Sequence, residues 1–238
     1  MEALLETTKE NTALPNRSTD RSAEERLPER FWSPTQEPSA ISYQISKDTE
    51  FLQQYFKLRE AMFISVWGLK HFDGKADEYD AVAHIMIASQ NTLCVGGARI
   101  LVKQEMGDLL LPMESEDFIL EELLPDLELH KHTYGEFSRL AIIPEFRKAE
   151  VIRMFYRRLN AHAIECGMQY VFAVAPMSQA RGYRRAYRAM GLKYDIVRDV
   201  VIPDREEYEG LEMCLSVLDL TEEIAAYKAM KSDGGQIS

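Results

Sequence analysis

Residues 137–175 read FSRLAIIPEFRKAEVIRMFYRRLNAHAIECGMQYVFAVA and decide the fold class. The stretch 137–143 is mostly apolar and predicts a strand, while 150–166 has the apolar spacing of an amphipathic helix that Gly167 ends. Residues 170–175 are a continuous apolar run that Pro176 stops, as in a buried strand. Two strands joined by a helix run parallel, so this stretch predicts a parallel strand pair inside an α/β sheet.

The flanking sequence adds antiparallel strands to this pair. Upstream, alternating or apolar runs and turn-forming residues predict strands at 41–45, 84–88 and 93–102, a helix capped by Thr49, and a short helix at 116–124. Downstream, they predict a helix at 179–190, strands at 193–201 and 213–218, and a last helix from 221. We therefore expect a single-domain α/β protein with a mixed, mostly antiparallel sheet flanked by helices.

The chain divides into three parts by composition. Residues 1–40 are rich in Glu, Arg, Ser, Thr and Pro and predict a disordered tail, residues 41–220 predict the folded domain, and residues 221–238 predict a C-terminal helix and tail. The chain lacks a long apolar run and a signal-like start, and Cys94, Cys166 and Cys214 lie far apart. This favours a cytoplasmic protein with neither a disulfide framework nor a clustered zinc site.

Charge is distributed unevenly along the sequence. The net charge is −11, which argues against a nucleic-acid binder. Between residues 139 and 193, however, the sequence contains eleven basic residues and only three acidic ones. Such a region favours an anionic partner held at one face, and the alternative is an ordinary solvated helix surface.

The sequence contains few of the common catalytic motifs. It has no nucleotide-binding glycine loop, no His-Glu-x-x-His and no nucleophile elbow. His130 and His132 flank Lys131 without further ligand types nearby, so we expect surface histidines there and no metal site.

Acidic and basic side chains instead stand inside apolar segments. Arg99 lies in an apolar strand and must be paired, and the available acids are Asp77, Asp80 and Glu136. Strand alternation predicts Glu136 and Ser138 on one side of their strand, and Phe137 and Arg139 on the other. The alternative is a buried ion network that only stabilises the fold.

These residues give the sequence a family resemblance over about residues 41–218. It resembles the acyl-homoserine lactone (autoinducer) synthases of quorum sensing and the related N-acyl amino acid synthases, both built on the GNAT acyltransferase fold. The matching positions, in order, are Arg59 and Phe63, Asp77 and Asp80, Arg99 after a glycine pair, Phe118, and Glu136-x-Ser138-Arg139.

The resemblance implies a GNAT-like fold and an amine N-acyltransferase. Its catalytic group would be Glu136, Ser138 and Arg139, with Glu136 as the general base. Substrate would be bound by two arginines, two aspartates and three aromatic walls, namely Arg59, Phe63, Asp77, Asp80, Arg99, Phe118 and Phe172.

The donor implied is a fatty acyl thioester on the phosphopantetheine of an acyl carrier protein, with no tightly bound cofactor. Residues 147–152 lack the glycines that let a backbone approach the pyrophosphate of coenzyme A, and acyl carrier proteins are acidic. We expect the carrier to dock on two basic helix stripes, made of Arg153, Arg157, Arg181, Arg184 and Arg188.

The acceptor is expected to be the amine of an amino-acid-type small molecule. Leu69 stands where the lactone synthases usually have a tryptophan, and Trp67 lies two residues earlier. The alternative is therefore an acyl-homoserine lactone synthase that uses S-adenosylmethionine. An acetyl-CoA-dependent enzyme and a non-catalytic acyl-ligand sensor rank lower.

Overall fold

The computed structural model describes residues 41–198, 200–203 and 208–233, and all of them fall within one compact unit. The tail predicted at residues 1–40 and the last five residues of the predicted C-terminal tail lie outside the described residues. None of the described helices is long and apolar enough to cross a membrane.

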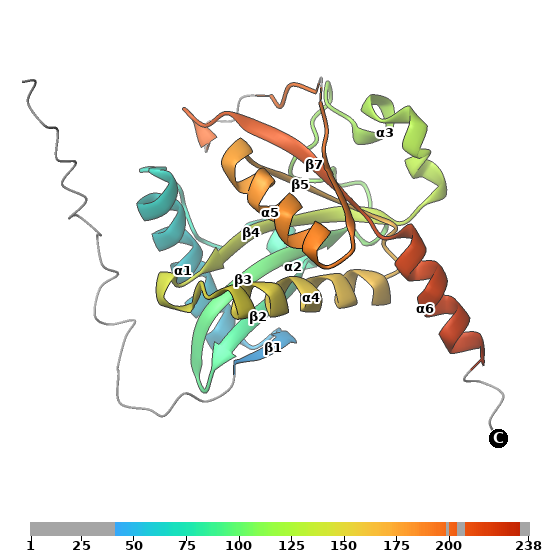
Figure 1. Ribbon diagram of the computed structural model, residues 1–238. Helices are drawn as coiled ribbons and strands as arrows, with labels where there is room; N and C mark the ends of the chain where they lie inside the picture. The colour runs from blue at the N-terminus through green and yellow to red at the C-terminus, as the bar shows by residue number, and fades with distance from the viewer. Residues whose placement is uncertain (1–40, 199, 204–207, 234–238) are drawn as a thin grey trace, which may run out of the picture. The chain divides into compact units, whose positions relative to one another are not determined.

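A seven-stranded sheet of order β1-β2-β3-β4-β5-β7-β6 forms the centre of the fold (Figure 1). Its strands are β1 (Ser42–Ile45), β2 (His84–Gln90), β3 (Leu93–Val102), β4 (Tyr134–Ile142), β5 (Tyr170–Pro176), β6 (Lys193–Ile196) and β7 (Met213–Asp219). Only β4 and β5 pair in parallel; every other neighbouring pair is antiparallel. The predicted mixed, mostly antiparallel α/β sheet is confirmed.

Six α-helices accompany the sheet among the described residues: α1 (Thr49–Trp67), α2 (Glu78–Val82), α3 (Leu120–Leu123), α4 (Ala149–Glu165), α5 (Met177–Ala189) and α6 (Thr221–Asp233). Three sequence predictions were wrong in detail, and the first is the strand predicted at 193–201, because β6 ends at Ile196. The cap of α1 is Asp48, whose carboxylate accepts from the N–H groups of Glu50 and Phe51, so Thr49 is already helical. The helix predicted at 116–124 shortens to α3, because Ser115 and Phe118 first form an isolated β-bridge.

The helices cover both faces of the sheet. A Cβ on Gly97 of β3 would lie 2.4 Å from the Tyr55 ring of α1, so α1 packs directly on that face. Ala98, the next residue, points the other way and lines an apolar cavity with Tyr156 of α4 and Tyr183 of α5. The close approach of Tyr55 to β3 explains why residue 97 is glycine.

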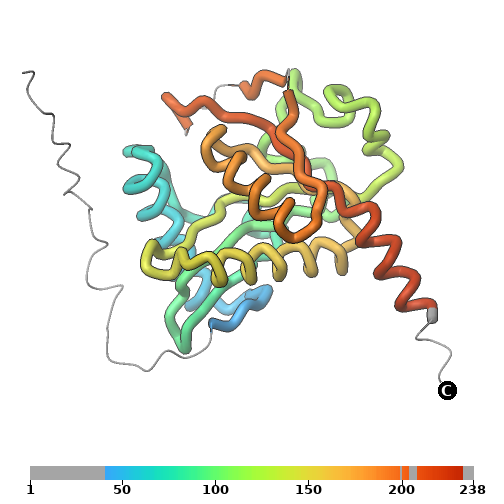
Figure 2. Tube along the Cα trace, viewed as in Figure 1, coloured from blue at the N-terminus to red at the C-terminus, as the bar shows by residue number. Residues whose placement is uncertain are grey.

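The two parallel strands separate after three residue pairs. β4 and β5 pair from Tyr134 with Tyr170 to Glu136 with Phe172, and then both strands continue without pairing to each other. The chain trace shows the divergence as a V between β4 and β5 (Figure 2). The split begins at Glu136, and beyond it β4 and β5 no longer pair with each other.

Candidate active site

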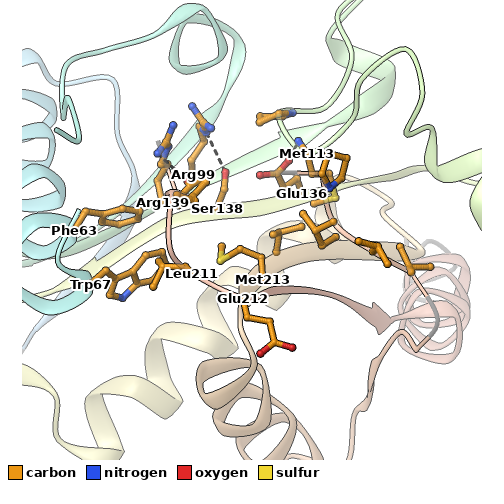
Figure 3. A pocket seen from close by; sticks show the side chains of 17 residues that line it. Phe63, Trp67, Arg99, Met113, Glu136, Ser138, Arg139, Leu211, Glu212 and Met213 are labelled. Carbon is orange, nitrogen blue, oxygen red and sulfur yellow. Dashed lines mark hydrogen bonds between the residues drawn. The ribbon is translucent and has the colours of Figure 1, made fainter. Parts of the chain in front are cut away.

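A cleft of about 320 Å³ opens where β4 and β5 separate (Figure 3). Its floor is the middle of the sheet, and its walls come from α1 and from the segment that joins β6 to β7. Five residues predicted to be functional line it, namely Phe63, Arg99, Glu136, Ser138 and Arg139. The cleft therefore brings the predicted catalytic group together with one aromatic and one arginine of the predicted substrate group.

Glu136 is a carboxylate buried at the point of the split. Only 4% of the residue is exposed, and its Oε2 accepts a hydrogen bond from the Met113 N–H at 3.3 Å. Burial raises the pKa of the Glu136 carboxyl, although the Arg99 guanidinium and a hydrogen bond from Ser138 favour the charged form. A carboxyl with a raised pKa on a cleft wall has the properties of a general base.

Arg99 links the sheet to residues 73–80, which carry Asp73, Asp77 and Asp80 and are called the acidic loop below. Its Nε donates to Ser138 Oγ at 3.1 Å, and its Nη1 donates to both Asp77 carboxylate oxygens, at 2.8 and 2.7 Å. Burial alone would raise the pKa of the Asp77 carboxyl, but the Arg99 charge and hydrogen bonds lower it. The prediction that Arg99 must be paired is confirmed for Asp77 and for Asp80, which lies 3.5 Å from Nη1.

Arg59 anchors the same acidic loop from α1. It forms a two-point salt bridge with Asp80 in which both side chains are nearly inaccessible. It also donates to the backbone oxygens of Gly74, at 2.9 Å, and of Lys75. A Cβ on Gly74 would meet Glu60 at 2.3 Å, so the loop can approach α1 only because residue 74 is glycine.

Arg139 lies on the opposite side of β4 from the one predicted. The register of β3 and β4 shifts between Gly97 and Arg99, which leaves an extra residue in β4, and Arg139 has a φ of +56°. This bulge breaks strand alternation, so Arg139 joins Ser138 and Glu136 in the cleft (Figure 3). Its Nη1 donates to the Tyr208 hydroxyl at 2.9 Å, and its backbone oxygen accepts from the Tyr55 hydroxyl at 2.8 Å.

Three aromatic side chains form one wall beside Arg139. The Phe63 ring lies 4.4 Å from that of Trp67, and Trp67 lies 6.3 Å from that of Tyr208. Phe63 therefore occupies the predicted aromatic wall. Phe118 and Phe172 are corrections to that prediction, because both are buried in a core cluster and neither lines the cleft.

A segment that the sequence did not single out supplies much of the remaining wall. Residues 200–203 and 208–212, between β6 and β7, contribute Val200, Ile202, Tyr208 and Leu211, and Met213 at the start of β7 adjoins them. Their composition carries no catalytic pattern, and nothing local indicates that they fold over β4. The only available signal was the persistence of apolar residues beyond the β6 strand.

Two further hollows adjoin the cleft. One of about 340 Å³ is lined by the acidic loop and shares Arg99, Arg139 and Pro112 with the cleft. The other, of about 140 Å³, lies between α1, α4 and α5 and shares Phe63 and Trp67 with it. Arg147 lines this second hollow and donates to the Ile142 backbone oxygen at 3.0 Å.

The predicted docking arginines lie outside these hollows. Arg153 and Arg157 are exposed on α4, and Arg181 and Arg188 are exposed on α5, while Arg184 is half-buried. Arg188 is paired with Asp195 at 3.2 Å. Tyr156 of α4 packs against Tyr183 and Tyr187 of α5, so the two helices that carry these arginines are neighbours.

Comparison with known proteins agrees with this fold. Residues 58–157 match the acetyltransferase (GNAT) domain family. Among solved structures, the fold is similar to FeeM, an N-acyl amino acid synthase from uncultured soil microbes, at 13% identity and a TM-score of 0.54, covering 77% of this chain and 92% of that chain. A search of curated proteins gave no match.

A second similar structure is BjaI, a CoA-dependent acyl-homoserine lactone synthase, solved with MTA. The identity is 15% and the TM-score 0.50, over 83% of this chain and 90% of that chain. At such identities the likeness concerns the fold alone. Together with the domain match, it confirms the expected GNAT fold: this protein is an acyltransferase of that fold.

Proposed function

We propose that this protein transfers a fatty acyl group from an acyl carrier protein thioester to the amine of an amino-acid-type acceptor. The observation that carries the proposal is the position of Glu136, a buried carboxyl of raised pKa at the point where β4 and β5 separate. Beyond this point the two strands no longer pair with each other, and a thioester carbonyl lying between them would be polarised by backbone N–H groups.

In the proposed reaction, the acceptor amine arrives protonated and first loses a proton to Glu136, directly or through water. The amine nitrogen then attacks the carbonyl carbon, the C–N bond forms, and the C–S bond breaks. The leaving thiolate takes up the second proton of the amine, which yields an amide and a free thiol. Ser138 and Arg99 hold the site for this step, because Arg99 donates to Ser138 and Ser138 hydrogen-bonds to Glu136.

The acyl tail has an apolar route away from Glu136. Met113 and Val174 line the cleft, and both also belong to or pack against the core cluster that contains Phe118 and Phe172. An acyl chain entering past these two residues would meet the phenylalanines that the sequence resemblance assigns to the acyl pocket. This arrangement supports a fatty acyl rather than an acetyl donor.

The acceptor fits best in the hollow at the acidic loop. Arg99 and Arg139 reach both this hollow and the cleft, so a carboxylate between them would position its neighbouring amine toward Glu136. Asp77 already neutralises part of this charge, since it pairs with Arg99 and lies 3.9 Å from Arg139. The acceptor carboxylate would therefore share the arginines with Asp77 rather than replace it.

A carrier-protein donor is supported at the N-terminus of α4. Lys148 is the N-cap and makes no side-chain capping bond, so the first N–H groups of this helix remain for an anion such as the phosphopantetheine phosphate. The basic stripes of the neighbouring α4 and α5 would receive the acidic carrier. Three free cysteines and this donor fit a cytoplasmic reaction.

Autoinducer synthesis is the second candidate, with S-adenosylmethionine as the acceptor and a homoserine lactone as product. Trp67 favours it, because its ring packs at a tilt against Phe63 in the cleft although its sequence position is displaced. An acetyl-CoA-dependent enzyme and a non-catalytic acyl sensor rank below both.

Mass spectrometry of lipid extracts from a host that expresses the protein distinguishes these functions. Acyl amino acids and acyl lactones differ in mass, so one product class appears above the empty-vector control. We expect acyl amino acids that disappear in a Glu136→Gln strain. Acyl lactones would establish the second candidate. Absence of both products with every donor would contradict an enzymatic function.

A further inference from the structure

Three potential metal ligands converge at a place that the acyl-transfer site does not use. They are His84 at the start of β2, His162 in the last turn of α4, and Cys166, which ends that helix. His84 Nδ1 lies 2.6 Å from His162 Nε2, and the Cys166 sulfur lies 3.7 Å and 3.6 Å from these two nitrogens. None of the three lines the cleft or its two neighbouring hollows.

A carboxylate lies beside the other nitrogen of each imidazole. His84 Nε2 lies 2.9 Å from Glu105, and His162 Nδ1 lies 3.6 Å from Glu165. Histidines that bind metals usually donate their second ring N–H to a carboxylate or carbonyl, which fixes the tautomer and orients the ring. In this cluster, both carboxylates favour the tautomers whose bare nitrogens point toward each other and toward the sulfur.

The spacing of the three ligand atoms is close to that of a tetrahedral zinc site. With Zn–N and Zn–S bonds of about 2.0 and 2.3 Å, tetrahedral geometry places nitrogen and sulfur about 3.5 Å apart and two nitrogens about 3.3 Å apart. The sulfur distances already match, and the two imidazoles need to separate by about 0.7 Å. Such a shift is small for rings that are partly exposed, at 27% and 18%.

We propose that His84, His162 and Cys166 bind a zinc ion that fastens the C-terminal end of α4 to β2. Two imidazole nitrogens and a thiolate are ligands that zinc prefers, and the fourth position remains for water or a carboxylate oxygen. The bond would join segments almost eighty residues apart in the sequence and stabilise the folded state. It would act independently of the acyltransferase chemistry.

This proposal replaces the sequence-based expectation of no metal site. His130 and His132, the histidines considered there, are not part of the cluster. The other two cysteines differ from Cys166, because Cys94 and Cys214 are buried and their thiols donate to backbone oxygens. Among the described residues, no other group of histidine, cysteine and carboxylate side chains converges in this way.

The test is titration of the full-length, chelator-treated protein with Co²⁺ and Zn²⁺. We expect one equivalent of Co²⁺ to bind with visible d–d bands and a near-ultraviolet thiolate-to-cobalt band, and Zn²⁺ to displace it. Cys166→Ala should remove the thiolate band, and His84→Ala should abolish stoichiometric binding. Glu105→Gln, which spares all three ligands, should weaken Zn²⁺ binding roughly 10–100-fold.

Matched controls are Cys214→Ala and His71→Ala, which remove the same side-chain types elsewhere, and circular dichroism checks that each variant folds. The controls should retain the wild-type cobalt spectrum. Absence of stoichiometric Co²⁺ binding by the wild type, or a thiolate band that persists in Cys166→Ala, would overturn the proposal. The cluster would then be a hydrogen-bonded histidine pair.

Discussion

Arg59 and Asp80 form a two-point salt bridge, with Nη2 to Oδ2 at 2.8 Å and Nη1 to Oδ1 at 3.0 Å, while only 1% and 3% of their side chains are exposed. Asp80 also accepts from the Asp77 backbone N–H, and the Asp77 carboxylate accepts from the Asp80 N–H, which closes a capping box at α2. The bridge therefore fixes the loop that carries Asp77 against Arg99. Stability and site geometry depend on the same pair.

Arg59→Ala is expected to lower the free energy of unfolding by about 3–5 kcal/mol, because it leaves a buried carboxylate without its partner. Denaturant unfolding followed by circular dichroism measures this loss. Lys75→Ala removes an exposed ion pair with Asp73 in the same loop and should leave stability unchanged. Equal stability of the Arg59 variant and the wild type would show that the bridge does not hold the loop.

The pH dependence of kcat should reflect the raised pKa of Glu136. A general base works in its deprotonated form, so kcat should fall as the pH drops through this raised pKa. The acid limb should therefore lie above the ordinary glutamate value of about 4.3. The measurement is kcat at intervals of about half a pH unit from about pH 4 to 9, which covers the ordinary pKa range of carboxyl and histidine side chains.

The same profile in Glu136→Gln provides the control for that assignment. The low residual rate should lose the acid limb that belongs to Glu136. A limb that remains at the same pH would assign the titration to another group, such as the acceptor amine.

Carrier docking predicts that the basic stripes affect the rate of association more than the chemistry. Arg184→Glu/Arg188→Glu should lower kcat/KM with the acyl carrier protein and flatten its salt dependence, since charges at the rim act on encounter rates. Reactions with acyl-CoA should change much less. Lys57→Glu, a reversal of an exposed charge on α1, serves as the control. Equal losses with both donors would contradict docking at this surface.

The acyl route past Val174 predicts a change in chain-length preference. Val174→Phe adds bulk between the cleft and the core cluster, so long acyl chains should lose roughly 10-fold or more in kcat/KM relative to short ones. Val82→Phe adds the same bulk at an exposed position of α2 and should change neither. A uniform loss over all chain lengths would place the acyl tail elsewhere.

Most of the fold could be predicted from the sequence because the patterns that indicate it are local. The strand–helix–strand stretch of residues 137–175 required a parallel pair, and Arg99 inside an apolar strand required buried acids. Physical rules applied to a few neighbouring residues were sufficient for both predictions.

The features that the sequence did not predict depend on long-range contacts. The bulge at Arg139 arises from the register of β4 against β3, and alternation along β4 alone gives the wrong side. Tyr208 and Leu211 reach the cleft only because the segment before β7 folds back over β4. The convergence of His84 with His162 and Cys166 joins residues that no local pattern connects.

The central claim is that Glu136 removes the proton from the acceptor amine during acyl transfer. Its most direct test is kcat of purified wild type and Glu136→Gln with acyl carrier protein donors and amino-acid acceptors, with melting temperatures measured in parallel. We predict a roughly 10²–10⁴-fold loss of kcat at an unchanged melting temperature. An unchanged kcat in a correctly folded Glu136→Gln protein would contradict the account.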